Sequence, residues 1–262
     1  MMQKFWRRKY QPMINLTGKT ALITGATGQL GRVMARTLAK NGADIVVHYI
    51  KNKEMAEKLV AEIKNMGQRA IAVQADISNE ADVNKVRDEV FETFGDVHIV
   101  VNNAVKQYEW KSIIEQDLED FQGQFDTCIK QSVLTAKAFL PKMIERKSGK
   151  FIGINTECSG LYDAGTGAYV AAKRGMDGLY RVLAKEVGQF GINVNQVAPG
   201  WTVSDRDREN GSEVSEEYNK KIPLNRRGTD EEIADAVLFL SSEMSSFITG
   251  VCLPVNGGAV MV

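Results

Sequence analysis

The sequence predicts a single α/β domain with a doubly wound, mostly parallel sheet of seven strands and helices on both of its faces. Three observations predict it: a length of 262 residues, seven short apolar runs, and helical patterns between successive runs. Parallel α/β sheets with covering helices often form one unit of roughly 250 residues. Apolar runs suit strands buried on both faces, and the alternation implies right-handed crossovers. The expected strands are 20–24, 44–49, 70–75, 97–101, 150–154, 192–198 and 251–255.

Helical patterns fill the intervals between these strands. One of them carries a core-facing stripe, because four apolar residues from Val83 to Phe94 recur every three or four positions. Helix starts carry capping residues, with Ser78 ahead of one helix and Thr229 ahead of another. The expected helices include 53–65, 80–94, 117–146, 167–188 and 230–241.

Charge and hydropathy exclude several classes of protein. The 33 basic and 33 acidic side chains give a formal net charge of zero, which argues against a nucleic-acid partner held by a basic face. No apolar run approaches the ~20 residues of a membrane span. We interpret 1–15 as a basic extension without the apolar core of a secretory signal, ahead of a nucleotide-binding domain at 16–262.

Cysteine and histidine usage gives no sign of a metal site. Cys128, Cys158 and Cys252 are odd in number and lack C-x-x-C spacing, which disfavours disulfides and zinc and suits a reducing cytoplasm. His48 and His98 each stand in a strand-like run, and we interpret both as packed strand residues. We therefore expect no bound metal.

A glycine-rich turn follows the first expected strand and opens a helix. Gly25, Gly28 and Gly31 lie where the chain must bend, approach a pyrophosphate and pack helix against strand. The free N–H groups of a helix start attract phosphate. In the first crossover of an alternating chain, this pattern predicts a dinucleotide site.

The end of the second expected strand favours NADP over NAD. Folds that prefer NAD usually carry an acid about 20 residues after the glycine turn. Here 48–53 reads HYIKNK, without a carboxylate and with Lys51 and Lys53. Lysines would attract a 2′-phosphate, so NADP(H) is favoured and NAD(H) stays possible. In the alternative interpretation, the lysines only line a solvated helix start.

Tyr169 and Lys173 stand one helical turn apart, so both side chains share one helix face. A nearby ammonium group stabilises a phenolate and lowers the pKa of the tyrosine. A tyrosine adjusted in this way can act as general acid or base on a carbonyl/alcohol pair.

With these motifs the chain resembles the short-chain dehydrogenase/reductase family over residues 16–262. The resemblance implies a Rossmann-type sheet, a nicotinamide cofactor, and hydride transfer that interconverts a carbonyl and a secondary alcohol. The matching segments are TGATGQLG at 24–31, Asp76, NNA at 102–104, YVAAK at 169–173, APG at 198–200 and TGVCLPVNGG at 249–258.

The resemblance also implies roles for individual residues. Tyr169 would donate the proton, Lys173 would lower its pKa and bind the nicotinamide ribose, and Asp76 would contact adenine. The implied catalytic residues are Thr156, Tyr169 and Lys173. The implied cofactor-binding residues are Gly25, Thr27, Gly28, Gln29, Leu30, Gly31, Tyr49, Lys51, Asp76, Ile77, Asn103, Ala104, Val105, Tyr169, Lys173, Pro199, Gly200, Thr202 and Ser204.

The chain departs from the family pattern at several positions. Gln29 replaces the middle glycine of the usual TGxxxGxG, and Val105 replaces the glycine after NNA. Thr156 replaces the catalytic serine of the family and keeps a hydroxyl group. Ser204 stands where the family has a threonine and likewise keeps the hydroxyl. Cys128 aligns with the asparagine of the proton relay, and a thiol forms only weak hydrogen bonds.

Three functions stay open: an active oxidoreductase, a nucleotide-binding chain that has lost catalysis, and an interaction protein stabilised by cofactor. The retained Tyr169 and Lys173 favour activity on a small-molecule carbonyl or alcohol. A carboxylate at Glu157 beside aromatic walls suits a polar hydroxylated substrate such as a sugar or polyol, unless Glu157 faces solvent. The alternative is a 3-oxoacyl thioester. Candidate substrate-side residues are Lys106, Gln107, Tyr108, Glu157, Tyr162 and Trp201.

Two expectations concern assembly and motion. Family members pair through long helices, here 117–146 and 167–188, and the apolar end 251–262 would be buried in a homodimer or homotetramer. The polar segment 201–228, called the lid below, would close over the substrate. Its alternative is a permanently ordered surface helix.

Overall fold

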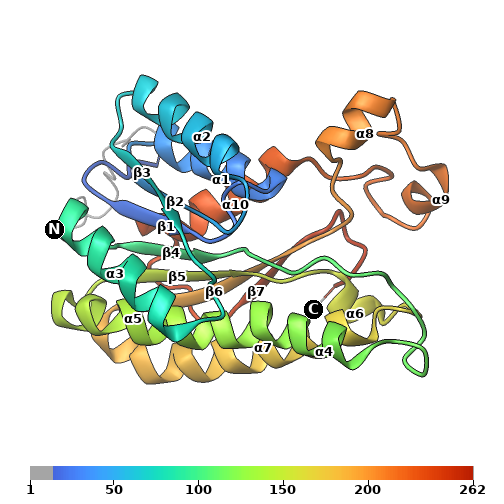
Figure 1. Ribbon diagram of the computed structural model, residues 1–262. Coiled ribbons are helices and arrows are strands. Elements are labelled where there is room, and N and C mark those ends of the chain that lie inside the picture. The colour runs from blue at the N-terminus through green and yellow to red at the C-terminus, as the bar shows by residue number, and fades with distance from the viewer. Residues whose placement is uncertain (1–13, 262) are drawn as a thin grey trace, which may run out of the picture.

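The computed structural model describes residues 14–261, so the prediction for 1–15 falls almost entirely outside the described residues. Seven strands form one sheet in the order β3-β2-β1-β4-β5-β6-β7, and every pair is parallel (Figure 1). This confirms the predicted fold class. The strands are β1 (Thr20–Ile23), β2 (Asp44–Tyr49), β3 (Ala70–Gln74), β4 (Ile99–Asn102), β5 (Gly149–Ile154), β6 (Ile192–Pro199) and β7 (Cys252–Val255).

The helices follow the predicted ranges closely, and α2, α3 and α10 have the predicted bounds. The segment expected at 117–146 consists of α4, a π-helical turn η1 and α5 in succession. The helices are α1 (Gln29–Lys40), α2 (Lys53–Asn65), α3 (Glu80–Phe94), α4 (Leu118–Phe125), η1 (Asp126–Lys130), α5 (Gln131–Arg146), α6 (Cys158–Leu161), α7 (Gly167–Val187), η2 (Gly188–Phe190), α8 (Asp205–Asn210), α9 (Glu216–Asn219), α10 (Asp230–Ser241) and η3 (Glu243–Ser245).

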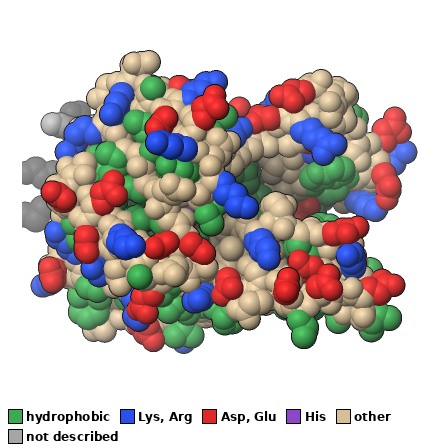
Figure 2. Space-filling view, in the orientation of Figure 1, with side chains coloured by type: hydrophobic (Ala, Val, Ile, Leu, Met, Phe, Trp, Pro, Cys, Tyr) green, Lys and Arg blue, Asp and Glu red, His purple; other side chains and the backbone are tan. Residues whose placement is uncertain are grey.

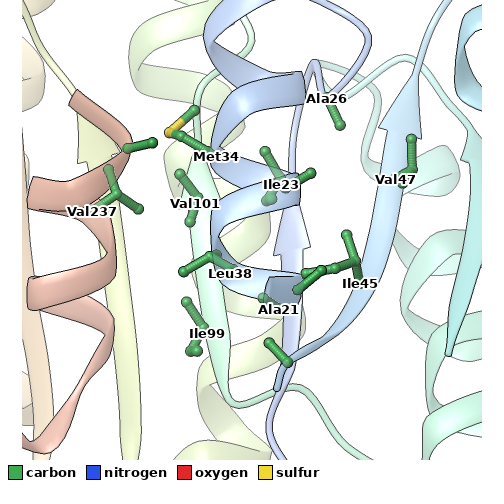
Figure 3. Packing of buried hydrophobic residues seen from close by; sticks show 14 of the residues in the cluster. Ala21, Ile23, Ala26, Met34, Leu38, Ile45, Val47, Ile99, Val101 and Val237 are labelled. Atoms are coloured by element: carbon green, nitrogen blue, oxygen red, sulfur yellow. The ribbon is translucent and has the colours of Figure 1, made fainter. Parts of the chain in front are cut away.

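Two apolar layers hold the helices on the sheet. Helices α1, α2 and α10 cover one face, and α3, α5 and α7 cover the other (Figure 1). In the first layer Met34 and Leu38 of α1 pack against Ile23, Val101 and Val237 without solvent exposure (Figure 3). Burial of one such side chain stabilises the fold by about 1.5–3 kcal/mol.

Side-chain caps set the starts of two helices. Thr229 caps α10 through a reciprocal capping box with Glu232, as predicted. The prediction of Ser78 as the cap of α3 is wrong, because the side chain of Asn79 accepts the first free N–H groups. The Ser78 hydroxyl donates to Asp76 instead, at 2.7 Å.

His48 is a packed residue of β2, as predicted, whereas His98 lies one residue before β4 and is only partly buried, so the prediction of a packed strand residue is wrong there. The His48 Nδ1 atom accepts the N–H of Gly25 at 3.1 Å, and Nε2 lies 3.1 Å from the carbonyl oxygen of Ala75. His48 therefore joins the end of β2 to the glycine turn and to the segment after β3. The His98 Nδ1 atom accepts the N–H of Thr20 in the same manner. Within 14–261 no helix is long and apolar enough to cross a membrane.

The burial of His48 predicts a specific pH dependence of stability. Burial lowers the pKa of His48 to about 4, whereas the unfolded chain keeps a value near 6.5. The stability that neutral His48 contributes is present above pH ~6.5 and is lost as pH falls toward about 4. The loss reaches about 3 kcal/mol.

We expect His48→Asn, which keeps an acceptor near the position of Nδ1, to remove this part of the pH dependence. Urea unfolding at pH 7 and pH 4.5 should show a loss for the parent chain that is about 2 kcal/mol larger than for the variant. Equal losses would show that His48 does not control acid stability.

Candidate active site

A cavity of about 910 Å³ opens at the carboxyl ends of β1 to β4, where open α/β sheets bind ligands. Its walls are the glycine turn, the ends of β2 and β3, the segment after β4, and α4. The predicted cofactor residues that line it are Gly25, Thr27, Gly28, Leu30, Gly31, Lys51, Asp76, Ile77, Asn103, Ala104 and Val105.

Two glycines of the turn are required by close contacts. Gly25 has a φ of +60°, and a Cβ there would lie 3.0 Å from the Cα of Ala104. A Cβ on Gly31 would lie 2.5 Å from the carbonyl oxygen of Gly25. The bare backbone therefore faces the cavity at the start of α1, an arrangement that accepts a pyrophosphate.

Thr24 fixes the two central strands to each other at this edge. Its hydroxyl oxygen accepts the N–H groups of Asn103 at 2.8 Å and Ala104 at 3.0 Å. The same hydroxyl donates to the side chain of Gln131, and the Asn103 amide donates back to the carbonyl of Thr24 at 2.9 Å. The predicted pair Asn103–Ala104 is thus held rigidly at the cavity wall.

Sequence reasoning missed part of the cavity wall. Tyr49 lies in the hydrophobic core, whereas Ile50 lines the cavity, because successive side chains of a strand point in opposite directions. The wall from α4 had no motif that could indicate it. The lining residues that were not predicted as cofactor or substrate contacts are His48, Ile50, Ala75, Ser78, Glu119, Gln122, Gly123, Asp126 and Thr127.

The three predicted catalytic residues lie near one another, Thr156 after β5 and the other two in the first turns of α7, and none of them belongs to the wall of this cavity. Lys173 is buried, its Nζ lies 5.6 Å from the centre of the Tyr169 ring, and it donates to the carbonyl of Ile154. The Thr156 hydroxyl is a hydrogen-bond partner of the Tyr169 phenol. Tyr108 accepts the N–H of Tyr169 at 3.0 Å, so this predicted substrate-side residue positions the start of α7.

The pKa of Tyr169 departs from the expected direction. Burial raises it above the ordinary value, and the opposing effects of Lys173 and the Thr156 hydrogen bond do not cancel that rise. The sequence showed the lysine one turn away but not the burial of the phenol. Tyr169 is therefore protonated at neutral pH and suits donation of a proton to a carbonyl oxygen.

Cys128 lies fully buried in η1, the π-helical turn between α4 and α5. Single π-helical turns inside helices are frequent at functional sites. Its carbonyl oxygen accepts the hydroxyl of Ser132 at 2.8 Å. The aligned family asparagine is thus replaced by a residue whose side chain adds no strong hydrogen bond.

Glu157 does not face solvent, so the alternative interpretation of its sequence position is wrong. It is 5% exposed, and its Oε1 accepts the N–H of Trp201 at 3.0 Å and the hydroxyl of Tyr218 at 2.8 Å. Burial raises the pKa of this carboxyl. Glu157 therefore ties the end of β5 to the lid through Oε1, while its buried Oε2 has no hydrogen-bond partner.

The lid contains two short helices, α8 and α9, held by a buried guanidinium. Arg227 donates to the carbonyl of Thr202 at 2.9 Å and to Asp207 at 2.7 Å, and it lies 4.1 Å from the centre of the Trp201 ring. Ser204 caps α8 through a capping box with Asp207. Figure 2 shows the lid standing across a cleft from the rest of the molecule.

The remaining predicted cofactor residues lie outside the cavity wall: Gln29 opens α1, Tyr169 and Lys173 belong to α7, and Pro199, Gly200, Thr202 and Ser204 lie where β6 passes into the lid. Thr202 donates its hydroxyl to the carbonyl of Gly200. Within 14–261 no three His, Cys, Asp or Glu side chains are grouped to hold a metal ion.

Comparison with known proteins agrees with this geometry. Residues 25–260 match a family model described as enoyl-(acyl carrier protein) reductase. The chain is 36% identical over 253 residues to the 3-oxoacyl-(acyl-carrier-protein) reductase FabG of Staphylococcus epidermidis, covering 93% of this chain and 99% of the relative.

Two solved structures share the fold over almost their whole length. A 7α-hydroxysteroid dehydrogenase complexed with NADH and a 7-oxo bile acid superposes with a TM-score of 0.85 at 30% identity, over 95% of this chain and 96% of its own. An NAD⁺-bound xylitol dehydrogenase superposes with a TM-score of 0.87 at 27% identity, over 93% of this chain and 99% of its own.

Proposed function

Because this chain belongs to the short-chain dehydrogenase/reductase family, we propose that it reduces a ketone on an apolar chain with NADPH, with 3-oxoacyl thioesters as the first candidate substrates. The family assigns the coarser activity, a nicotinamide-dependent interconversion of carbonyl and alcohol. The substrate class, the direction and the choice of NADPH are our proposal.

The apolar approach to Tyr169 carries the proposal. Trp110 and Ile113 are more than half exposed. Trp110 lies against Gly165 and Ile113 against Gly167, which are four and two residues before Tyr169. On the lid, Trp201 and Val214 are exposed as well, and Figure 2 shows hydrophobic side chains on the lid where it borders the cleft. Exposed apolar surface of this kind indicates a binding site for apolar groups.

The case for a sugar or polyol has weakened. It depended on an accessible Glu157, which is 5% exposed and whose Oε1 is bound by Trp201 and Tyr218, so that only the buried Oε2 has no partner. A polyol remains the second candidate because the xylitol dehydrogenase shares the fold at 27% identity.

Each group of residues at the site has its own role in the proposed reduction. When bound, the nicotinamide supplies the hydride. Tyr169 holds a proton at its phenol oxygen for the carbonyl oxygen, and the Thr156 hydroxyl lies beside it to orient that oxygen. Lys173 is placed by its bond to Ile154, within reach of the Tyr169 ring. The glycine turn and Asp76 would hold the cofactor.

A substrate panel with both nicotinamides tests the proposed function. We expect NADPH-dependent reduction of 3-oxoacyl thioesters to exceed that of keto sugars in kcat/KM. Faster turnover of a polyol or keto sugar would favour the second candidate. Tight NADPH binding without turnover of any carbonyl would instead identify a nucleotide-binding chain that has lost catalysis.

Removal of the Tyr169 hydroxyl should abolish most of the turnover. We expect Tyr169→Phe to lower kcat at least about a hundredfold, since a positioned general acid contributes that much or more. NADPH affinity, followed by fluorescence titration, should remain within about twofold, because the phenol ring is retained. Parent-like turnover in the variant would remove Tyr169 from the mechanism.

Lys51 should determine the choice between the two nicotinamides. It lines the cavity, and the Lys51→Asp variant should bind NADPH about tenfold more weakly while NADH affinity changes little, because a charged hydrogen bond contributes about 1.5–3 kcal/mol. Lys53→Asp is the matched control, since Lys53 pairs with Glu57 on the surface of α2. Equal weakening of NADPH and NADH in Lys51→Asp would contradict the assignment.

We further propose a homodimer or homotetramer. Apolar side chains on α4, α5 and α7 are exposed on the single chain, among them Phe125, Val133 and Val182. Strand β7 lies at the sheet edge and is only partly buried. Light scattering at micromolar concentration should give two or four times the mass of the chain, and a monomer would contradict this proposal.

A further inference from the structure

Gln29 makes contacts that a glycine in its place cannot make. It is the first residue of α1, directly after the turn that faces the cofactor cavity. Its side-chain amide donates to the carbonyl of Val203 at 2.8 Å and to the carboxylate of Asp230 at 2.8 Å. One side chain thus joins the glycine turn to the base of the lid and to the start of α10.

Arg32, one turn further along α1, makes a parallel connection. Its guanidinium donates to the carbonyl of Thr27 at 2.7 Å and pairs with Asp205, the first residue of α8. The Arg32 side chain is only 17% exposed, so solvent screens this contact less than it would on an open surface. Two side chains of α1 therefore link the glycine turn to the lid: Arg32 binds α8 directly, and Gln29 binds the segment just before it.

Asp230 anchors the connection from the other side. It is 1% exposed and accepts hydrogen bonds from Gln29 and from Arg208 of α8, the latter at 3.0 and 2.5 Å. Burial acts to raise the pKa of Asp230, but the hydrogen bonds it accepts outweigh burial and keep the carboxyl ionised. A buried carboxylate needs such donors, so their removal leaves a charge without partners.

We propose that Gln29 is a positioning residue that holds the base of the lid, and through Asp230 and Arg208 also α8, against the cofactor turn and thereby sets the height of the substrate cleft. The proposal rests on the proposed function for its kinetic consequence, but the contact itself exists without any ligand. In this account the position of the lid depends on a residue next to the glycine turn that receives the cofactor, and Gln29 acts on the substrate through the lid.

Three substitutions of Gln29 distinguish the need for a hydrogen-bond donor from the need for a side chain of this length. In Gln29→Ala both hydrogen bonds are lost. In Gln29→Glu the length is kept, but a second carboxylate faces Asp230. In Gln29→Lys a donor of similar reach is kept and should rescue the function. Arg36→Ala is the matched control, because Arg36 lies on the same helix and pairs with Glu62 of α2.

Hydrogen exchange of the backbone amides in 205–211, measured without cofactor or substrate, tests whether Gln29 holds this part of the lid. We expect about tenfold faster exchange in Gln29→Ala and Gln29→Glu, and parent-like exchange in Gln29→Lys and Arg36→Ala. Steady-state kinetics should then show a ketone KM raised severalfold in the first two variants, with kcat within about twofold of the parent.

Unchanged exchange in 205–211 for both Gln29→Ala and Gln29→Glu would overturn the proposal. A fall in kcat with an unchanged KM for the ketone would also overturn the proposal, because a residue that positions the lid should act first on substrate binding. If the parent chain turns over no ketone, the proposed function fails, whereas the exchange rates still decide whether Gln29 holds the lid.

Discussion

The hydroxyl of Thr24, at the end of β1, accepts two backbone N–H groups that follow β4 and fixes these strands side by side. After β1 the chain crosses to the face covered by α1, and after β4 it crosses to the face covered by α5. The crevice between the diverging segments is where open α/β sheets bind ligands. Because Gly25 approaches Ala104 so closely, the floor of this crevice has no room for side chains.

Charged residues build the other wall of the site. Inside the lid, Arg227 is the central residue, because its buried guanidinium binds lid carbonyls and Asp207. Glu157 binds the beginning of the lid, and Gln29 and Arg32 bind it from α1. These contacts hold the lid in its present position, and its closure over a bound substrate stays a prediction.

Local patterns sufficed for the sheet, the helices and the cavity floor, because strand alternation and the glycine turn are encoded within about 20 residues. Contacts between distant residues could not be predicted. Gln29 and Asp230 are separated by 201 positions, and Glu157 and Tyr218 by 61. The predicted direction of the Tyr169 pKa was wrong for the same reason. The neighbouring lysine is a local feature, whereas burial of the phenol depends on how the whole site packs.

Transfer of deuterium from NADPH that carries deuterium at both positions of nicotinamide C4 tests the central claim most directly. If the crevice at β1 and β4 holds the nicotinamide beside Tyr169, mass spectrometry of the product alcohol should show one deuterium on the former carbonyl carbon. Alcohol formed without deuterium, or bound NADPH with no alcohol from any ketone offered, would contradict the account.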